Sequence, residues 1–256
     1  MNAQPPVGPA GSPPRPLAVV TGASAGIGKA IALRLAEEGF RLLLGARRED
    51  RVREIAAEIG AEARVLDVAD ESSVAAFCAG IDRVEVLVNN AGGARGADLI
   101  AESRSGAWRW MWEVNVLGLM QMTRALLPAL EGSGRGHIVN ISSTAGIEVY
   151  EGGGGYTSVK HAVHAISRTL RLELAGCPIR VTEVSPGMVE TDFSLNRFEG
   201  DAARAAGVYE GVTPLTAADV ADVVAFAVTR PAHVNLDEIV IRPLQQAAAH
   251  KVVRRD

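Results

Sequence analysis

The segment LAVVTGASAGIG, residues 17–28, determines how this chain begins to fold. Its first five residues are aliphatic or β-branched, which is typical of a buried strand. Glycines follow at Gly22, Gly26 and Gly28, where a strand that turns tightly into a helix needs residues without a side chain. The free N–H groups and the positive dipole end at the start of such a helix attract a phosphate. The segment therefore predicts a strand, a phosphate-binding turn and a helix, in that order.

Outward from this segment, short aliphatic runs alternate with longer helical patterns. The aliphatic runs predict strands at 17–21, 41–46, 63–68, 84–90, 137–142, 179–185 and 238–243. Helices are expected after the first strand to about 38, after the second to about 59, and over 71–79, 108–130, 156–175 and 217–229. Strands that alternate with helices pair in parallel and are joined by crossover helices. The predicted fold is α/β, a single doubly wound parallel sheet with helices on both faces, which is the Rossmann fold.

The composition indicates one soluble domain. The chain has 256 residues, of which 48% are apolar, so it can bury a large core. A net charge of -4 argues against binding to nucleic acid, and no run approaches the roughly 20 apolar residues of a membrane span. Residues 1–16 are rich in Pro and Gly and lack the apolar stretch of a signal peptide. They are expected to be a disordered tail before a domain at 17–256.

The end of the second predicted strand indicates which dinucleotide the turn binds. An acidic residue there would bind the ribose 2′-hydroxyl of NAD, whereas a basic residue accommodates a 2′-phosphate. The strand ends in Arg47 and Arg48 with no acid at the turn, which favours NADP over NAD. The alternative is that both arginines are solvated residues at the start of a helix. Asp67, at the end of the third strand, is either an adenine contact or a turn residue.

Further along the chain, three residues form a candidate catalytic group. Tyr156 and Lys160 are four residues apart, so on a helix they project from one face. An ammonium beside a phenol favours the phenolate, which predicts a pKa of Tyr156 lowered toward neutrality and a role in proton exchange. Ser143 ends the fifth predicted strand, on the side of the sheet where ligands bind, and can donate a hydrogen bond to a substrate oxygen. Ser142 is the alternative.

Several motifs together resemble the short-chain dehydrogenase/reductase family over residues 17 to about 243: TGASAGIG, NNAG at 89–92, Asn115, ISS at 141–143, YTSVK at 156–160 and PGMVET at 186–191. The resemblance implies that Tyr156 is the general acid or base and that Lys160 holds the nicotinamide ribose and tunes Tyr156. It also implies that Ser143 orients the carbonyl group. Asn115 would support a water-filled proton relay.

The same resemblance extends the cofactor site. It implies that 90–92 line the adenosine side and that residues of 186–191 cover the nicotinamide. One departure is Ala25, where some NADP-preferring relatives carry a basic residue, so the choice of NADP depends on the two arginines. The full predicted cofactor-binding set is Gly22, Ser24, Ala25, Gly26, Ile27, Gly28, Arg47, Arg48, Asp67, Val68, Asn90, Ala91, Gly92, Tyr156, Lys160, Pro186, Gly187, Val189 and Thr191.

The segments at 180–201 and 230–246 resemble the bacterial serine 3-dehydrogenase or 3-hydroxy acid dehydrogenase branch. A small 3-hydroxy acid such as serine or 3-hydroxyisobutyrate is then the expected substrate, contacted by Ser143, Tyr156 and a substrate loop at about 187–212. Within that loop Arg197 is the candidate to bind the carboxylate, because a guanidinium pairs with it through two hydrogen bonds. The alternative is a solvated loop arginine.

Three other functions are the alternatives to this prediction. They are a reductase of another carbonyl class (a 3-oxoacyl thioester, a sugar or a xenobiotic ketone), a non-catalytic NADP-sensing regulator and a structural subunit. No metal site is expected, because His161 and His164 have no facing carboxylate or cysteine cluster in the sequence. The two cysteines lack any pairing pattern, which indicates the cytoplasm. The family resemblance implies a homotetramer with the helices at 108–130 and 156–175 in one interface.

Overall fold

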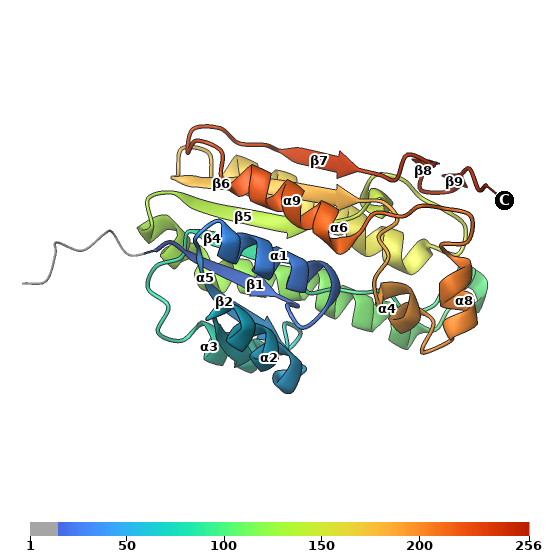
Figure 1. Ribbon diagram of the computed structural model, residues 1–256, viewed down its shortest axis with the longest axis horizontal. Coiled ribbons are helices and arrows are strands. Elements are labelled where there is room, and N and C mark those ends of the chain that lie inside the picture. Colours follow the sequence, from blue (N-terminus) through green and yellow to red (C-terminus); the bar gives the residue numbers. More distant parts are fainter. Residues whose placement is uncertain (1–14, 256) are drawn as a thin grey trace, which may run out of the picture.

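Seven parallel strands form the central sheet in a computed structural model that describes residues 15–255 (Figure 1). Their order across the sheet is β3-β2-β1-β4-β5-β6-β7, with all neighbours parallel. The strands are β1 (Leu17–Thr21), β2 (Arg41–Ala46), β3 (Glu62–Val65), β4 (Val86–Asn89), β5 (Gly136–Ile141), β6 (Ile179–Pro186) and β7 (Glu238–Ile241). The chain order reverses between β1 and β4, so the predicted doubly wound Rossmann fold is confirmed.

Helices cover both faces of the sheet because successive strand residues point to opposite sides. Val20 of β1 packs in one apolar cluster with α1 (Gly26–Glu37), α2 (Glu49–Ile59) and α9 (Ala217–Val228). Val19 packs in a second cluster with α3 (Glu71–Cys78) and α5 (Gly118–Gly132), beside α6 (Gly154–Glu173). Strands buried on both faces are aliphatic throughout, which is why the sequence gives continuous apolar runs.

The predicted elements differ from the structure by more than two residues in three places. β3 ends at Val65 instead of residue 68, because its single neighbour β2 ends at Ala46, the register partner of Val65. The helix predicted at 108–130 begins earlier as α4 (Ser105–Trp112) and continues through a π-helical turn, Glu113–Leu117, into α5. The substrate loop contains two short helices, α7 (Phe193–Arg197) and α8 (Ala202–Gly207), that the sequence pattern did not predict.

The folded chain extends beyond the central sheet at both ends. The predicted tail lies mostly outside the described residues, but Arg15 and Pro16 are attached to the domain: Arg15 Nε donates to the Gly39 carbonyl at 2.8 Å, and the Pro16 carbonyl accepts from Arg41. Arg15 and Pro16 therefore contact the domain that is predicted to begin at residue 17. At the other end a hairpin of β8 (Gln246–Ala248) and β9 (Lys251–Val252) follows β7. Within the described part of the chain, no helix is long and apolar enough to cross a membrane.

Candidate active site

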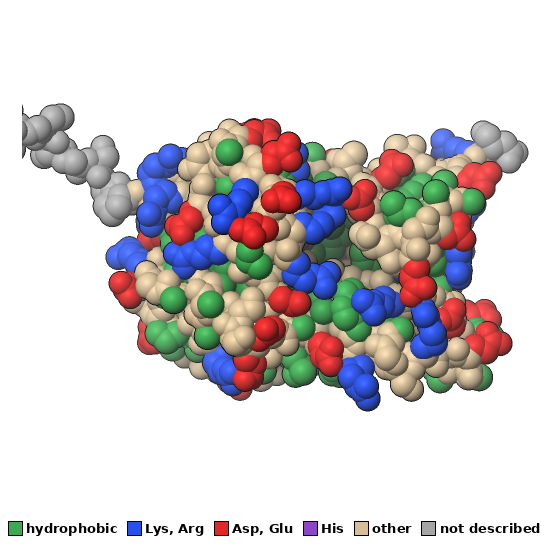
Figure 2. All heavy atoms as spheres, turned by 90° about the horizontal axis from the view of Figure 1, so that it is seen from below, with side chains coloured by type: hydrophobic (Ala, Val, Ile, Leu, Met, Phe, Trp, Pro, Cys, Tyr) green, Lys and Arg blue, Asp and Glu red, His purple; other side chains and the backbone are tan. Residues whose placement is uncertain are grey.

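A pocket of about 650 Å³ opens where the strands end and the order of the sheet reverses. Its walls come from the loops after β1, β4, β5 and β6, with additional residues from the C-terminal hairpin. Figure 2 shows a hollow on this side of the molecule with basic side chains along part of its border. In open α/β sheets ligands bind at this position, outside the carboxyl ends of the strands.

The loop between β1 and α1 is shaped to approach a phosphate. Gly22 and Gly26 have φ angles of +66° and +53°, a conformation that side chains other than glycine disfavour. A Cβ atom on Gly28 would lie 2.4 Å from the Gly22 carbonyl oxygen, so this position is also closed to a side chain. The residue before α1 is Ala25, and no side chain caps the first N–H groups of the helix. These features fit a dinucleotide pyrophosphate.

Of the two arginines predicted to select NADP, Arg48 lines the pocket and Arg47 is not among its lining residues. Arg48 Nε donates to Ser24 Oγ at 3.2 Å, which links the end of β2 to the phosphate loop. Both side chains are exposed, and within residues 15–255 neither forms an ion pair with an acid. A phosphate group could therefore use their charge.

Two residues predicted to contact adenosine, Asp67 and Val68, are not among those that line the pocket. Asp67 Oδ1 accepts a hydrogen bond from the Ala69 N–H at 3.1 Å, as a turn residue does, and Asp67 does not line the pocket. Val68 is buried against the helix start at Gly118, where an added Cβ atom would lie 2.6 Å from Val68 Cγ2. The geometry thus gives both residues packing or turn roles.

Polar contacts fix the loop after β4 to its neighbours. Thr21 Oγ1 accepts hydrogen bonds from the N–H groups of Asn90 and Ala91, each at 3.0 Å. Asn115, in the π-helical turn, donates through Nδ2 to the Gly93 carbonyl at 2.9 Å and accepts from the Gly93 N–H at 3.1 Å. π-helical turns inside longer helices are frequent at functional sites. Asn115 is buried, and its side chain holds the backbone beside Gly92, where the pocket begins.

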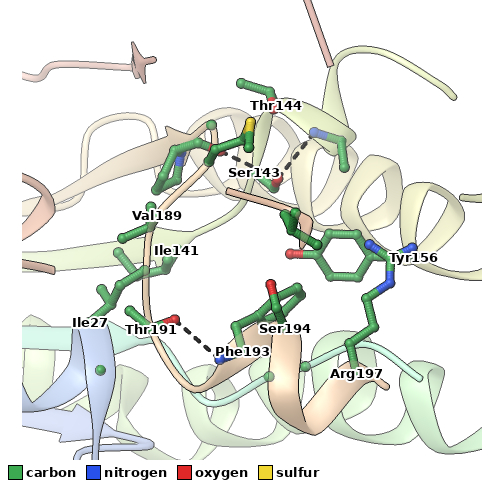
Figure 3. A pocket seen from close by; sticks show the side chains of 18 of the residues that line it. Ile27, Ile141, Ser143, Thr144, Tyr156, Val189, Thr191, Phe193, Ser194 and Arg197 are labelled. Carbon is green, nitrogen blue, oxygen red and sulfur yellow. Dashed lines mark hydrogen bonds between the residues drawn. The ribbon is translucent and has the colours of Figure 1, made fainter. Parts of the chain in front are cut away.

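The three predicted catalytic side chains, Ser143, Tyr156 and Lys160, all line the pocket. Figure 3 shows Ser143 and Tyr156 pointing into it. Tyr156 lies in the first turn of α6, and its ring centre is 5.4 Å from that of Phe193. Lys160 follows one turn later and donates to the Ile141 carbonyl at 3.0 Å, with Nζ 5.7 Å from the Tyr156 ring centre. Ser143 Oγ donates to the Pro186 carbonyl at 3.4 Å and lies close enough to the Tyr156 phenol to influence its pKa.

The structure separates the two candidate serines. Ser143 Oγ accepts a hydrogen bond from the Ala145 N–H at 3.1 Å and faces Tyr156. Ser142 is buried, and its hydroxyl lies where a Cβ atom on Gly146 would come within 2.8 Å of it. This hydroxyl has no hydrogen-bond partner among the described residues. Ser143 is the serine that is placed to act together with Tyr156.

The predicted pKa of Tyr156 is wrong in direction. Burial raises the pKa of the Tyr156 phenol and nearby Tyr150 raises it further, whereas the Ser143 hydroxyl and the charge of Arg197 act in the opposite sense. Lys160 is not among the groups that shift it, and its ammonium donates to the Ile141 carbonyl. Burial lowers the pKa of Lys160 to about 8. The phenol is therefore protonated at neutral pH and can act as a proton donor.

Arg197, at the end of α7, lines the pocket beside Tyr156. Its Nε donates to the Gly96 carbonyl at 2.8 Å and its Nη1 to the Tyr150 hydroxyl at 3.2 Å. The guanidinium carbon is 5.9 Å from the centre of the Tyr156 ring. Within residues 15–255 no acidic side chain pairs with Arg197. Its place is therefore in the pocket and not on a solvated loop.

Sequence reasoning missed several pocket residues. Tyr150 and Phe193 flank Tyr156, and Gln246 of the C-terminal hairpin accepts a hydrogen bond from the Met188 N–H at 2.8 Å. An added Cβ atom on Gly187 would lie 2.1 Å from Gln246 Oε1, so the two segments are in close contact. These residues belong to no recognisable motif, because the fold alone brings the C-terminus back to the pocket.

The expectation that no carboxylate faces His164 is wrong. His164 Nδ1 lies 3.1 Å from Glu183 Oε2 and 3.8 Å from Glu238 Oε1, because neighbouring strands β6 and β7 pair in register at these residues. His161 Nδ1 instead lies 2.8 Å from the Thr157 carbonyl of its own helix. The sequence spacing could not reveal a partnership between residues on two different strands.

The comparison with known families agrees with the fold and the pocket. Residues 16–202 match the family model described as short chain dehydrogenase, and the chain belongs to this family. An uncharacterized oxidoreductase of Mycobacterium tuberculosis is 57% identical over 92% of this chain and 94% of its own length. An NADP-dependent 3-hydroxy acid dehydrogenase of Schizosaccharomyces pombe is 40% identical over 93% of this chain and 96% of its own.

Solved structures point to the same branch. The closed form of a serine dehydrogenase in complex with NADP+ superimposes with a TM-score of 0.89 at 36% identity. The match covers 94% of this chain and 100% of that one. The predicted family and its resemblance to the serine and 3-hydroxy acid dehydrogenase branch are confirmed.

Proposed function

We propose that this protein transfers a hydride between NADP(H) and a small 3-hydroxy acid, such as serine or 3-hydroxyisobutyrate, or the corresponding carbonyl compound. The observation that carries the proposal is the position of Arg197, a guanidinium beside the Tyr156 phenol and unpaired with any acid in the described chain. A carboxylate-bearing substrate needs such a cation near the group that exchanges the proton. The relatives named as 3-hydroxy acid and serine dehydrogenases support the same substrate class.

The cofactor proposal rests on the phosphate loop and on Arg48. The first N–H groups of α1 would hold the pyrophosphate, and Arg48, with Arg47 beside it, would bind a 2′-phosphate. Two relatives support this choice, since one is named NADP-dependent and the other was solved with NADP+. Bound NADPH supplies a hydride to the carbonyl carbon of the substrate.

Tyr156 is proposed to move the proton. In the reductive direction its phenol donates a proton to the carbonyl oxygen, and in the oxidative direction the phenolate takes it back. Burial raises the pKa of Tyr156, so the donor is protonated over the physiological range. The Ser143 hydroxyl donates a hydrogen bond to the same oxygen as negative charge develops there. Lys160 would hold the nicotinamide ribose, and Asn115 would support the proton relay.

Arg197 is proposed to set the orientation of the substrate. Two of its nitrogens are held by Gly96 and Tyr150, so the guanidinium is fixed in the pocket before a substrate arrives. Its Nη2 has no hydrogen-bond partner in residues 15–255 and can bind a carboxylate oxygen. Binding the carboxylate at this end places the other end of a short substrate toward Ser143 and Tyr156.

A paired substrate screen tests the function. Rates are measured with NADP+ and NAD+ on serine, 3-hydroxyisobutyrate and 3-hydroxypropionate, each against an uncharged alcohol of the same size. We expect the carboxylates to exceed the matched alcohols by about tenfold or more in kcat/KM, which corresponds to about 1.4 kcal/mol. Equal or faster turnover of the uncharged alcohols would contradict the substrate proposal. The proposed roles of Ser143, Tyr156 and Lys160 do not depend on that result.

We also propose the homotetramer and the cytoplasmic location that the family resemblance implies. Trp112 and Leu117, at the junction of α4 and α5, are large apolar residues with 39% and 45% of their surface exposed, as expected for an interface. The molar mass in solution, measured by light scattering, tests the assembly. A monomer would contradict it.

A further inference from the structure

A row of polar side chains crosses four neighbouring strands behind the pocket. Asn89 of β4, Asn140 of β5, Glu183 of β6 and Glu238 of β7 are successive register partners, so their side chains share one face of the sheet. Asn89 Nδ2 donates to Asn140 Oδ1 at 3.0 Å, and Asn140 Nδ2 donates to Ser167 of α6 at 2.9 Å. This is the face that α5 and α6 cover. Within the row, Glu183 is the acid that lies wholly in the interior.

The immediate contacts of Glu183 do not include a group with a permanent positive charge. Its side chain is 0% exposed, accepts a hydrogen bond from Ser185 Oγ at 3.1 Å and lies 3.1 Å from His164 Nδ1. A buried carboxylate is costly unless a cation balances it. Arg171 pairs with Glu238 at 3.2 Å, at the more exposed edge of the row. The interior charge therefore needs a different partner.

Lys160 is a buried cation without a paired acid among the described residues. Its ammonium is buried, donates to the Ile141 carbonyl, and has no carboxylate within ion-pair distance among the described residues. It lies one helical turn before His164, on the face of α6 that covers β5 and β6. Burial lowers the pKa of Lys160, and the charge of Glu183 acts against this and raises it. Ile141, which accepts from Lys160, is the register partner of Val184, the residue after Glu183, so the ammonium and the carboxylate occupy neighbouring positions of one buried layer.

We propose that Glu183 is a positioning residue for the active-site lysine: its buried carboxylate, held in place by His164 and Ser185, is the counter-charge that keeps Lys160 an ammonium. The proposal rests on the proposed function in taking Lys160 as the lysine of the site. As a consequence, the polar row on the sheet face covered by α5 and α6 sets the charge of Lys160 in the pocket. Glu238 pairs with Arg171 at its outer edge, so Glu183 is the acid of the row that has no Lys or Arg within ion-pair distance among the described residues.

The charge of Lys160 can be measured without turnover. The cofactor-free protein is labelled with trace acetic anhydride from about pH 6 to about pH 10, and acetylation of each lysine is read by peptide mass spectrometry. Lys29 and Lys251, the other lysines of the sequence, serve as internal standards. We expect Lys160 to titrate at about 8 in the wild type. Glu183→Gln should lower that midpoint by about one pH unit, with both standards unchanged.

Two substitutions of His164 separate charge from structure. His164→Gln keeps an uncharged donor to Glu183, so the midpoint of Lys160 should stay within a few tenths of a unit of the wild type. His164→Lys places a second ammonium against Glu183 and should lower the midpoint as Glu183→Gln does. It supplies the test if Glu183→Gln does not fold, since His164 is partly exposed.

Unchanged midpoints in the Glu183→Gln and His164→Lys proteins would overturn the proposal. A shift in His164→Gln equal to that in Glu183→Gln would also overturn it, because loss of the helix-to-strand contact would then be the cause. The labelling involves neither substrate nor cofactor, so its outcome is independent of whether the proposed reaction is correct.

Discussion

The guanidinium carbon of Arg197 lies 5.9 Å from the centre of the Tyr156 ring, although the two residues are on different helices and about 40 positions apart. The contact is built by reciprocal bonds: Arg197 Nε donates to the Gly96 carbonyl, and the Gly96 N–H donates to the Arg197 carbonyl at 3.0 Å. A cation is thereby fixed beside the phenol that is proposed to donate the proton. The same charge acts to lower the pKa of Tyr156 against the larger effect of burial.

Replacing Arg197 tests carboxylate recognition. Arg197→Gln should lower kcat/KM for a 3-hydroxy acid by about 30-fold, because a charge-assisted hydrogen bond contributes about 2 kcal/mol. Uncharged alcohols of the same size should lose less than about threefold. Steady-state kinetics on the two substrate types measure the difference. As a control, Arg204→Gln on the neighbouring helix α8, which stacks on Phe198, should leave both substrates unaffected.

Removing the Tyr156 hydroxyl tests its role as the proton donor. Tyr156→Phe should reduce kcat by about 10³-fold, as expected when a general acid is lost. The ring still packs on Phe193, so NADPH binding measured by fluorescence should remain within about threefold. Tyr150→Phe is the matched variant: it keeps the Tyr156 hydroxyl and removes only the one that holds Arg197 Nη1, so it should affect KM for a 3-hydroxy acid and leave most of kcat. A Tyr156→Phe enzyme with wild-type turnover would remove this tyrosine from the mechanism.

The fold was predictable because its signals are local. The apolar runs gave six strands within about two residues of their observed ends, and the motifs around Gly22, Ser143 and Tyr156 gave the pocket from β1, β5 and α6. Each of these features needs only neighbouring residues in the sequence, a strand followed by a turn or a helix face with period four.

Features that depend on the pairing of distant elements were missed. The contact of Glu183 with His164 requires the register of β6 against α6, and the approach of Gln246 to Met188 requires the chain to return after β7. The direction of the Tyr156 pKa failed for a related reason. Burial is a tertiary property, whereas the Tyr-to-Lys spacing is local and gave the opposite sign.

Cofactor preference should depend on Arg48. Arg48→Ala should raise the KM for NADP+ by about tenfold, because it removes a cation from the 2′-phosphate, and should leave the KM for NAD+ unchanged. Arg47→Ala should act in the same direction and to a smaller extent, because Arg47 does not line the pocket. Arg53→Ala, on the same helix but paired with Glu49, is the control. A higher kcat/KM with NAD+ in the wild type would contradict the assignment.

Gly92 should tolerate no side chain. A Cβ atom there would lie 2.6 Å from Asn115 Oδ1, so Gly92→Ala must displace the side chain that holds Gly93. We expect a loss of about 1–3 kcal/mol in the free energy of unfolding, measured in urea, together with weaker NADPH binding. Gly106→Ala in α4 is the matched control, because its Cβ would meet nothing within 4 Å. That variant should be as stable as the wild type or slightly more stable.

The reductive reaction should lose rate in alkali through Lys160. Burial lowers the pKa of this lysine to about 8, so the ammonium is present below that pH and lost above it. Burial raises the pKa of Tyr156, so the proton donor remains protonated through the same range. We therefore expect kcat/KM for reduction to be level below about pH 8 and to fall by about tenfold per unit above it. Lys160→Arg keeps a positive charge that does not titrate in this range, so any remaining activity should persist to higher pH. If kcat/KM of the Lys160→Arg enzyme falls at the same pH as that of the wild type, the alkaline loss is due to another group. The charge of Lys160 is then not what the reaction requires.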